Sequence, residues 1–146
     1  MTVKYKVFPI DKPEPGFPWE KETWVPVLNV GIIVGHSRSR LFEAVVDSGS
    51  ASCLFHADIG KAHGLKLESG AKGPLGGVIS GATASVYYHP VKLVIASHII
   101  QITAGFTPAL SVAAILGRHG FFEHFKVVFD PASSPPGLTI ERIHRA

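Results

Sequence analysis

One segment of the chain joins an apolar run to a single acid and then to a turn of small residues, and that order limits the folds open to it. The run Ala44–Val46 predicts a buried strand, because valine side chains pack well inside sheets. The strand ends at Asp47, and residues 48–50 favour a tight turn whose amides and hydroxyls can hydrogen-bond to the carboxylate. A second apolar run, 53–55, leads back into the body. An ionised carboxylate bordered by apolar residues is unstable without such hydrogen bonds, so Asp47 is the first candidate functional residue.

The composition indicates one compact domain rich in strands. At 146 residues, with 46% hydrophobic and 17% charged side chains, the chain can build a core of its own. Fifteen Gly and eleven Pro indicate many turns, which is typical of an all-β chain with one or two short helices. Apolar patterning predicts strands at residues 24–34, 41–46, 84–95, 98–106, 112–117, 126–129 and 138–143.

Charge and cysteine usage narrow the partners and the compartment. The net charge of +3 is scattered, and no basic block exceeds two residues, so no nucleic-acid partner is expected. No run approaches the roughly 18 apolar residues of a membrane span, so no membrane partner is expected either. Cys53 is the only cysteine, and no apolar leader follows Met1. Together these features predict a cytoplasmic protein without disulfides.

The first 20 residues predict an extended arm before a domain at 21–146. Four prolines in this stretch favour extended backbone over a packed unit. Trp19 and Trp24 are expected to anchor the arm to the domain.

A glycine-rich loop and two short segments complete the outline. Residues 69–81 hold five glycines and a proline, which predicts a loop projecting from its flanking strands. This loop is either an ordinary hairpin tip or a cover over a site. A short helix or turn is expected at 58–63, and Arg118–Phe125 is the strongest helix candidate because Phe121 and Phe125 lie four residues apart.

The turn Asp47-Ser48-Gly49-Ser50 resembles the active-site turn of the aspartic proteases. The apolar return at 51–55 is similar to the family's path back into the core. The glycine-rich loop around Gly76-Gly77 lies where the family has its flap. The segment Ile115-Leu116-Gly117 resembles the family's hydrophobic–hydrophobic–Gly segment, which precedes its C-terminal helix. Order and spacing agree over most of the chain.

The length of the chain selects a branch of that family. Pepsin-like enzymes carry two such turns, whereas neither Asp58 nor Asp130 precedes a Ser-Gly or Thr-Gly pair here. The chain therefore resembles a single-lobed, retropepsin-like domain, which implies a closed β-barrel whose site is completed by an identical subunit.

The resemblance implies an aspartic endopeptidase that acts as a homodimer on extended peptides, without a metal or another cofactor. Two Asp47 carboxyls at the dimer axis share one proton. The ionised carboxyl activates water, and the protonated one donates to the scissile carbonyl.

Further roles follow from the same resemblance. Ser48 is expected to hydrogen-bond across the axis, Gly49 to leave room near the carboxylates, and Ser50 to donate to an outer oxygen of Asp47. The remaining site residues are the flap tip and the segment that supports the turn, namely Gly76, Gly77 and Val78 and Ile115, Leu116 and Gly117.

Other interpretations are weaker on the residues alone. The eight histidines form no His-x3-His pair or His/Cys cluster, so no metal site is expected. Cys53 lies beside Leu54, which favours a buried packing role over that of a thiol nucleophile. Asp47 on its own would also fit a plain turn cap. The alternative function is a retropepsin-like module that binds peptides or dimerises without cleaving.

Overall fold

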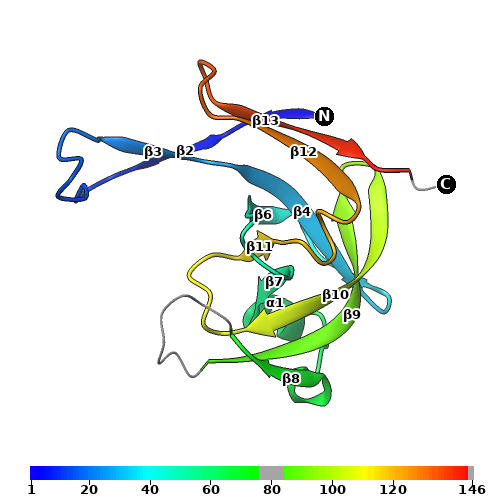
Figure 1. Ribbon diagram of the computed structural model, residues 1–146. Helices are drawn as coiled ribbons and strands as arrows, with labels where there is room; N and C mark the ends of the chain where they lie inside the picture. Colours follow the sequence, from blue (N-terminus) through cyan, green and yellow to red (C-terminus); the bar gives the residue numbers. More distant parts are fainter. Residues whose placement is uncertain (76–83, 145–146) are drawn as a thin grey trace.

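The computed structural model describes residues 1–75 and 84–144, and its centre is a closed barrel of six strands (Figure 1). The sheet runs in the order β5-β4-β6-β11-β7-β10-β9-β8, and pairing between β4 and β9 closes it. The eight strands are β4 (Val27–Val34), β5 (Ser37–Arg38), β6 (Phe42–Val46), β7 (Leu54–His56), β8 (Ala71–Pro74), β9 (Ser85–Ile95), β10 (His98–Thr107) and β11 (Ala114–Leu116). The predicted strands at 41–46, 84–95 and 112–117 are present with shorter ends, the one at 98–106 extends to Thr107, and the one at 24–34 is divided at Pro26 between β4 and the strand before it.

The barrel interior is filled by aliphatic and aromatic side chains from alternate strand positions. Phe55 and Phe106 stack with ring centroids 5.6 Å apart, and Phe42 meets Phe55 edge-on at 5.8 Å. Both Phe55 and Phe106 are fully buried. Each such ring contributes about 1.5–3 kcal/mol of hydrophobic stabilisation. The prediction that the chain builds one core is confirmed.

A second, three-stranded sheet joins the two ends of the chain. It has the order β1-β13-β12, with β1 (Thr2–Lys4), β12 (Phe125–Asp130) and β13 (Gly137–Arg142) all antiparallel. Side chains on its inner face, including Leu138 and Ile140, belong to the same buried cluster as the barrel. The first residues of the chain are therefore part of the packed domain.

The rest of the predicted arm forms a separate hairpin. Strand β2 (Lys6–Pro9) pairs with β3 (Glu22–Val25), and the pair extends away from the barrel (Figure 1). The expectation that Trp19 and Trp24 anchor the arm is wrong, because their side chains are 70% and 38% exposed. The hairpin has residues on both sides of position 20, and the division of the chain at that position stays a prediction.

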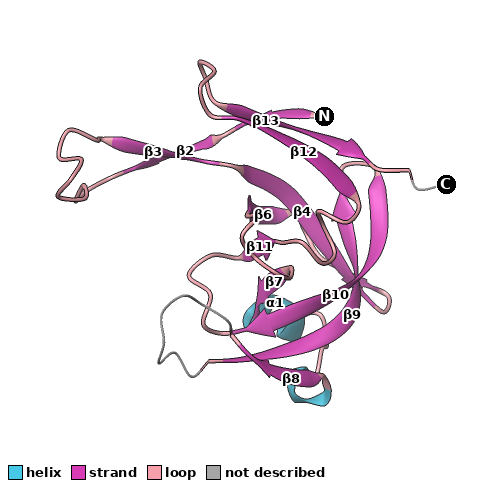
Figure 2. Ribbon diagram, in the orientation of Figure 1, coloured by secondary structure: helices cyan, strands magenta, loops and turns pink. Residues whose placement is uncertain are grey.

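Helices are few and short in the described part of the chain (Figure 2). Helix α1 (Ala57–Ala62) begins where His56 Nδ1 accepts the amide of Asp58, and soon after it the chain turns at Gly64, whose φ is +80°. A single 3-10 turn, η1 (Leu67–Ser69), follows. The prediction of an all-β chain with one or two short helices is confirmed. None of the described helices has the length and apolar composition needed to cross a bilayer.

The predicted helix over Arg118–Phe125 is wrong, since residues 118–124 form successive turns and Phe125 begins β12. Two of the local hydrogen bonds span five residues, and Gly120 has a φ of +98°, which breaks helical geometry. The backbone at His119 is committed instead to a parallel bridge with Ser52. Phe121 and Phe125 still share a face, stacked with centroids 5.2 Å apart.

Candidate functional site

Asp47 stands at the end of a central strand of the barrel. Strand β6 is flanked by β4, antiparallel, and by β11, parallel. The amide of Asp47 donates to Leu116 O at 3.0 Å, and the amide of Val46 donates to Pro26 O at 2.9 Å. Hydrogen bonds to the segments on both sides therefore fix the backbone of β6 as far as Asp47. The Asp47 side chain itself is exposed.

The turn after Asp47 is closed by its own backbone. Gly49 N–H donates to Asp47 Oδ1 at 2.9 Å, and Ser50 N–H donates to Asp47 O at 3.2 Å. A Cβ at position 49 would lie 3.2 Å from that carboxylate oxygen, so glycine allows the close approach. The Ser50 hydroxyl donates to Ser52 O at 2.8 Å, and not to an Asp47 oxygen as expected. The exposed Ser48 hydroxyl has no hydrogen-bond partner among the described residues.

Gly117 is the point at which the return from the turn crosses the supporting strand. Strand β11 lies between β6 and β7, so the chain must pass over its end to connect the two. A Cβ at Gly117 would lie 2.3 Å from Ser52 O and 2.7 Å from Ser50 O. Ser50 O also accepts the amide of Arg118 at 2.9 Å. Position 117 therefore has room only for glycine, because backbone carbonyls of the turn lie against it. This contact packs the segment Ile115–Gly117 against the Asp47 turn.

Cys53 packs behind the same crossing, away from solvent. The side chain is fully buried, and its sulfur would be 3.3 Å from a Cβ at Gly120. Burial raises the pKa of the Cys53 thiol to about 11, so it is protonated at neutral pH. The predicted packing role is consistent with this environment.

Glu123 closes the turns that follow Gly117. Its two carboxylate oxygens pair with His119 Nδ1 at 3.0 Å and accept Gly120 N–H at 3.1 Å. The hydrogen bond with His119 first, and that from Gly120 second, lower the pKa of Glu123 below its ordinary value. A lowered pKa means that the ionised form stabilises the fold.

Replacing Glu123 is expected to change how stability depends on pH. The carboxylate stabilises the fold above its ordinary pKa of 4.5, and that stability is lost as the pH falls through the lowered value. Glu123→Gln should therefore be less stable than wild type at about pH 6, with the difference shrinking towards about pH 3. Urea unfolding at both pH values measures it. Exposed Glu141 on β13 supplies the control, Glu141→Gln. If Glu123→Gln lowers the free energy of unfolding equally at both pH values, the loss comes from the changed shape of the side chain and not from its charge.

The predicted flap lies on a hairpin whose described part is its stem. Strands β8 and β9 pair in register from Ala71↔Tyr88 to Pro74↔Ser85, and Leu75 N–H donates to Ala84 O at 3.0 Å. The predicted tip residues Gly76, Gly77 and Val78 lie outside the described residues.

Sequence reasoning missed two backbone contributors to the turn. Pro26 lies within the predicted strand at 24–34, and its carbonyl accepts the amide of Val46. His119 was assigned to a helix, yet its amide donates to Ala51 O at 2.9 Å. Neither contact has a side-chain signature in the sequence, because both depend on which strands become neighbours.

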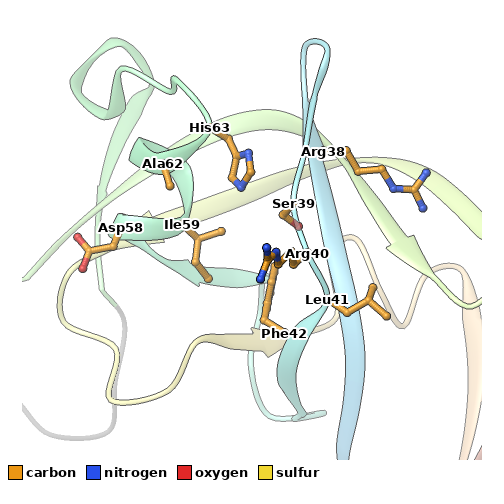
Figure 3. Close-up of a pocket in the computed structure, with 9 residues that line it drawn as sticks. All are labelled: Arg38, Ser39, Arg40, Leu41, Phe42, Asp58, Ile59, Ala62 and His63. Carbon is orange, nitrogen blue, oxygen red and sulfur yellow. The ribbon is translucent and has the colours of Figure 1, made fainter.

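A pocket of about 580 Å³ lies apart from the turn, between residues 38–42 and helix α1 (Figure 3). Arg40 and Ile59 face each other across it, whereas Asp58 points away (Figure 3). A second pocket, of about 360 Å³, borders Ser52 and His119 and so adjoins the site. The larger pocket has none of residues 47–50 in its described lining.

Comparisons of sequence identify no relative, since no protein-family model and no curated protein matches the chain. Comparisons of structure find solved proteins of similar fold. A retropepsin-like aspartic protease from Rickettsia conorii aligns with a TM-score of 0.55 and 14% identity, covering 79% of this chain and 89% of that one. The retroviral protease-like domain of Ddi1 from Leishmania major aligns with a TM-score of 0.51 and 17% identity, covering 70% and 81%. The chain therefore has the single-lobed fold of the retropepsin-like aspartic proteases.

Proposed function

We propose that the protein is an aspartic endopeptidase that works as a homodimer on extended peptides. The observation that carries the proposal is the exposed Asp47 carboxylate at the end of a central strand, in a turn closed by the Gly49 amide. The retropepsin-like fold supports the same conclusion.

The second carboxyl is expected from another copy of the chain. The other aspartates lie in unrelated settings: Asp11 in the loop of the β2–β3 hairpin, Asp58 in the first turn of α1, and Asp130 at the end of β12. None of the three is followed by Ser-Gly or Thr-Gly. A twofold axis beside the turn would bring the partner subunit's Asp47 against this one.

The proposed reaction needs only the two carboxyls and water. Like charges in contact cannot both ionise easily, so the pair holds one proton. The ionised Asp47 takes a proton as water attacks the scissile carbonyl carbon, and the partner subunit's Asp47 protonates the carbonyl oxygen. When the C–N bond breaks, a carboxyl returns a proton to the leaving amine.

The neighbouring residues are assigned supporting roles. Ser48 would hydrogen-bond across the axis, which fits a hydroxyl without a described partner in its own subunit. Gly49 and Ser50 hold the turn, and Ile115–Gly117 support it from β11. Residues Gly76, Gly77 and Val78 are proposed as the flap tip that closes over the peptide and excludes water.

The test measures cleavage of a denatured protein substrate from acid to neutral pH. Asp47→Asn keeps the size of the side chain but removes the acid, so activity should fall by at least about a hundredfold. Asp58→Asn is the matched control, because that side chain is 82% exposed on α1, away from the turn, and activity should not change. Sedimentation velocity should find a dimer for wild type and for both variants.

Two results would contradict the proposal. Cleavage that survives Asp47→Asn would show that another group does the chemistry. A dimer that binds peptide but cleaves nothing at any pH would identify a non-proteolytic binding module instead.

A further inference from the structure

The β2–β3 hairpin is the one paired element of the described chain that stands outside the packed domain. It forms a two-stranded sheet with the register Lys6↔Val25 to Pro9↔Glu22, and residues 10–21 connect the strands at its tip (Figures 1 and 2). Its base is tied to the barrel by an ion pair between Lys6 and Glu43. From here on, "the arm" means residues 6–25. It replaces the predicted arm of residues 1–20, whose first strand belongs to the packed domain.

The arm displays an unusual share of the exposed apolar side chains. Among the described residues, five of eleven exposed large hydrophobic side chains lie on it, namely Val7, Phe8, Phe17, Trp19 and Trp24. Both tryptophans of the chain are in this set. Exposed aromatic residues gathered on one element are typical of protein–protein contact surfaces.

The geometry of the arm also favours a partner. Val7 and Trp24 are directly opposite in the register and share a face, while Phe17 and Trp19 meet edge-on at the tip, 5.9 Å between centroids. A two-stranded hairpin on its own is marginally stable in water. An ordered hairpin with apolar residues on its strands and its tip therefore gains stability if another surface covers it.

The base of the arm lies directly beside the candidate catalytic strand. Strand β3 ends at Val25, and the carbonyl of the next residue, Pro26, accepts the amide of Val46 at 2.9 Å. Asp47 follows immediately. A second copy whose Asp47 reaches this one must approach next to the base of the arm, so the arm is placed to lie along that copy.

The distribution of charge is compatible with such a contact. The arm has four acidic and three basic side chains, a formal charge of −1, while the chain as a whole carries +3. The rest of the chain therefore carries +4. A body with a net charge of +4 does not repel an arm with a net charge of −1, so long-range electrostatics do not oppose the contact.

We propose that the arm packs on a second copy of this chain, so that its aromatic tip covers the partner's surface near the paired Asp47 turns. By twofold symmetry each subunit gives and receives one arm. The inference rests on the proposed homodimer and adds the element that holds it together.

The test compares two double variants of the full chain. Phe17→Ser with Trp19→Ser removes the apolar tip, whose two side chains are 52% and 70% exposed. Leu41→Ser with Ile99→Ser removes two similarly exposed apolar side chains, 64% and 55%, from the barrel strands and their connections. The dimer dissociation constant is measured by sedimentation across a concentration series, and urea unfolding confirms that each variant is folded. The tip variant should weaken the dimer by at least about tenfold, and the barrel variant should leave it unchanged.

The outcomes separate this inference from the proposed function. If wild type dimerises and cleaves while the tip variant dimerises equally well, the arm is not the dimer contact, and the peptidase proposal stands. If the tip variant loses the dimer but wild type cleaves nothing, the arm inference stands and the proposed activity fails. An unchanged dimer with a raised KM would assign the arm to substrate and overturn the inference. A wild type that stays monomeric at every concentration would overturn both.

Discussion

Cleavage by wild-type protein is expected to fall to about a tenth when it is refolded together with a roughly ninefold molar excess of the Asp47→Asn variant. The reason is that each active site would need one carboxyl from each subunit. In a random mixture about nine of ten wild-type subunits pair with a variant subunit, and those dimers lack the proton-sharing pair. Initial rates at a fixed amount of wild-type protein measure the effect.

The control for this experiment is the same refolding with Asp58→Asn in excess. That variant keeps Asp47, so the mixed dimers should all be active, and the total rate should rise in proportion to total protein. A rate that does not fall in the presence of Asp47→Asn would mean that one Asp47 is sufficient. The twofold site would then be wrong even if Asp47 is essential.

Gly117→Ala is expected to lower the free energy of unfolding by about 3 kcal/mol and to abolish cleavage. The new Cβ would lie 2.3 Å from Ser52 O and 2.7 Å from Ser50 O, and neither atom is free to move. Ser50 O accepts the amide of Arg118, and the bridge between Ser52 and His119 holds the other side. Relief of the clash must displace the return from the Asp47 turn, so stability and activity fall together.

Gly16→Ala is the matched control for that substitution, because nothing lies within 4 Å of a Cβ at Gly16. Its stability should stay within about 0.5 kcal/mol of wild type, or rise slightly as the unfolded chain loses freedom. Urea midpoints for both variants at one pH make the comparison. An unchanged midpoint for Gly117→Ala would mean that the two carbonyls can move aside, and the crossing would not be rigid.

Strand positions were predictable because their signal is local. The valines before Asp47 and the apolar alternation at 85–95 and 98–107 predict strands wherever one side of the chain is buried. All of these residues lie in strands. The Asp47 turn was predictable for the same reason. Its hydrogen bond runs from the Gly49 amide to the carboxylate of Asp47, only two residues earlier. The helix at Arg118–Phe125 was not, because the spacing of Phe121 and Phe125 is satisfied equally by the turns that replace it.

The orientation of the arm was likewise beyond sequence reasoning. The prolines indicated extended backbone, and Trp19 and Trp24 were expected to anchor it to the domain. Trp19 and Trp24 are exposed because the hairpin leaves the barrel at Pro26, where the chain enters β4. The direction in which the hairpin leaves the barrel depends on which strands flank β4. The local sequence does not indicate which strands those are.

The sequence by itself determined that this chain is mainly β, that one acid ends a buried strand, and that no second Asp-Ser-Gly turn exists in it. These follow from side-chain type and near neighbours. Only the tertiary structure decided that β11 inserts between β6 and β7, that Gly117 is the crossing point, and that the arm leaves the barrel with its aromatic residues exposed. Those features arise from contacts between segments up to about 70 residues apart, because hydrogen-bonding strands pair by backbone groups that every residue shares.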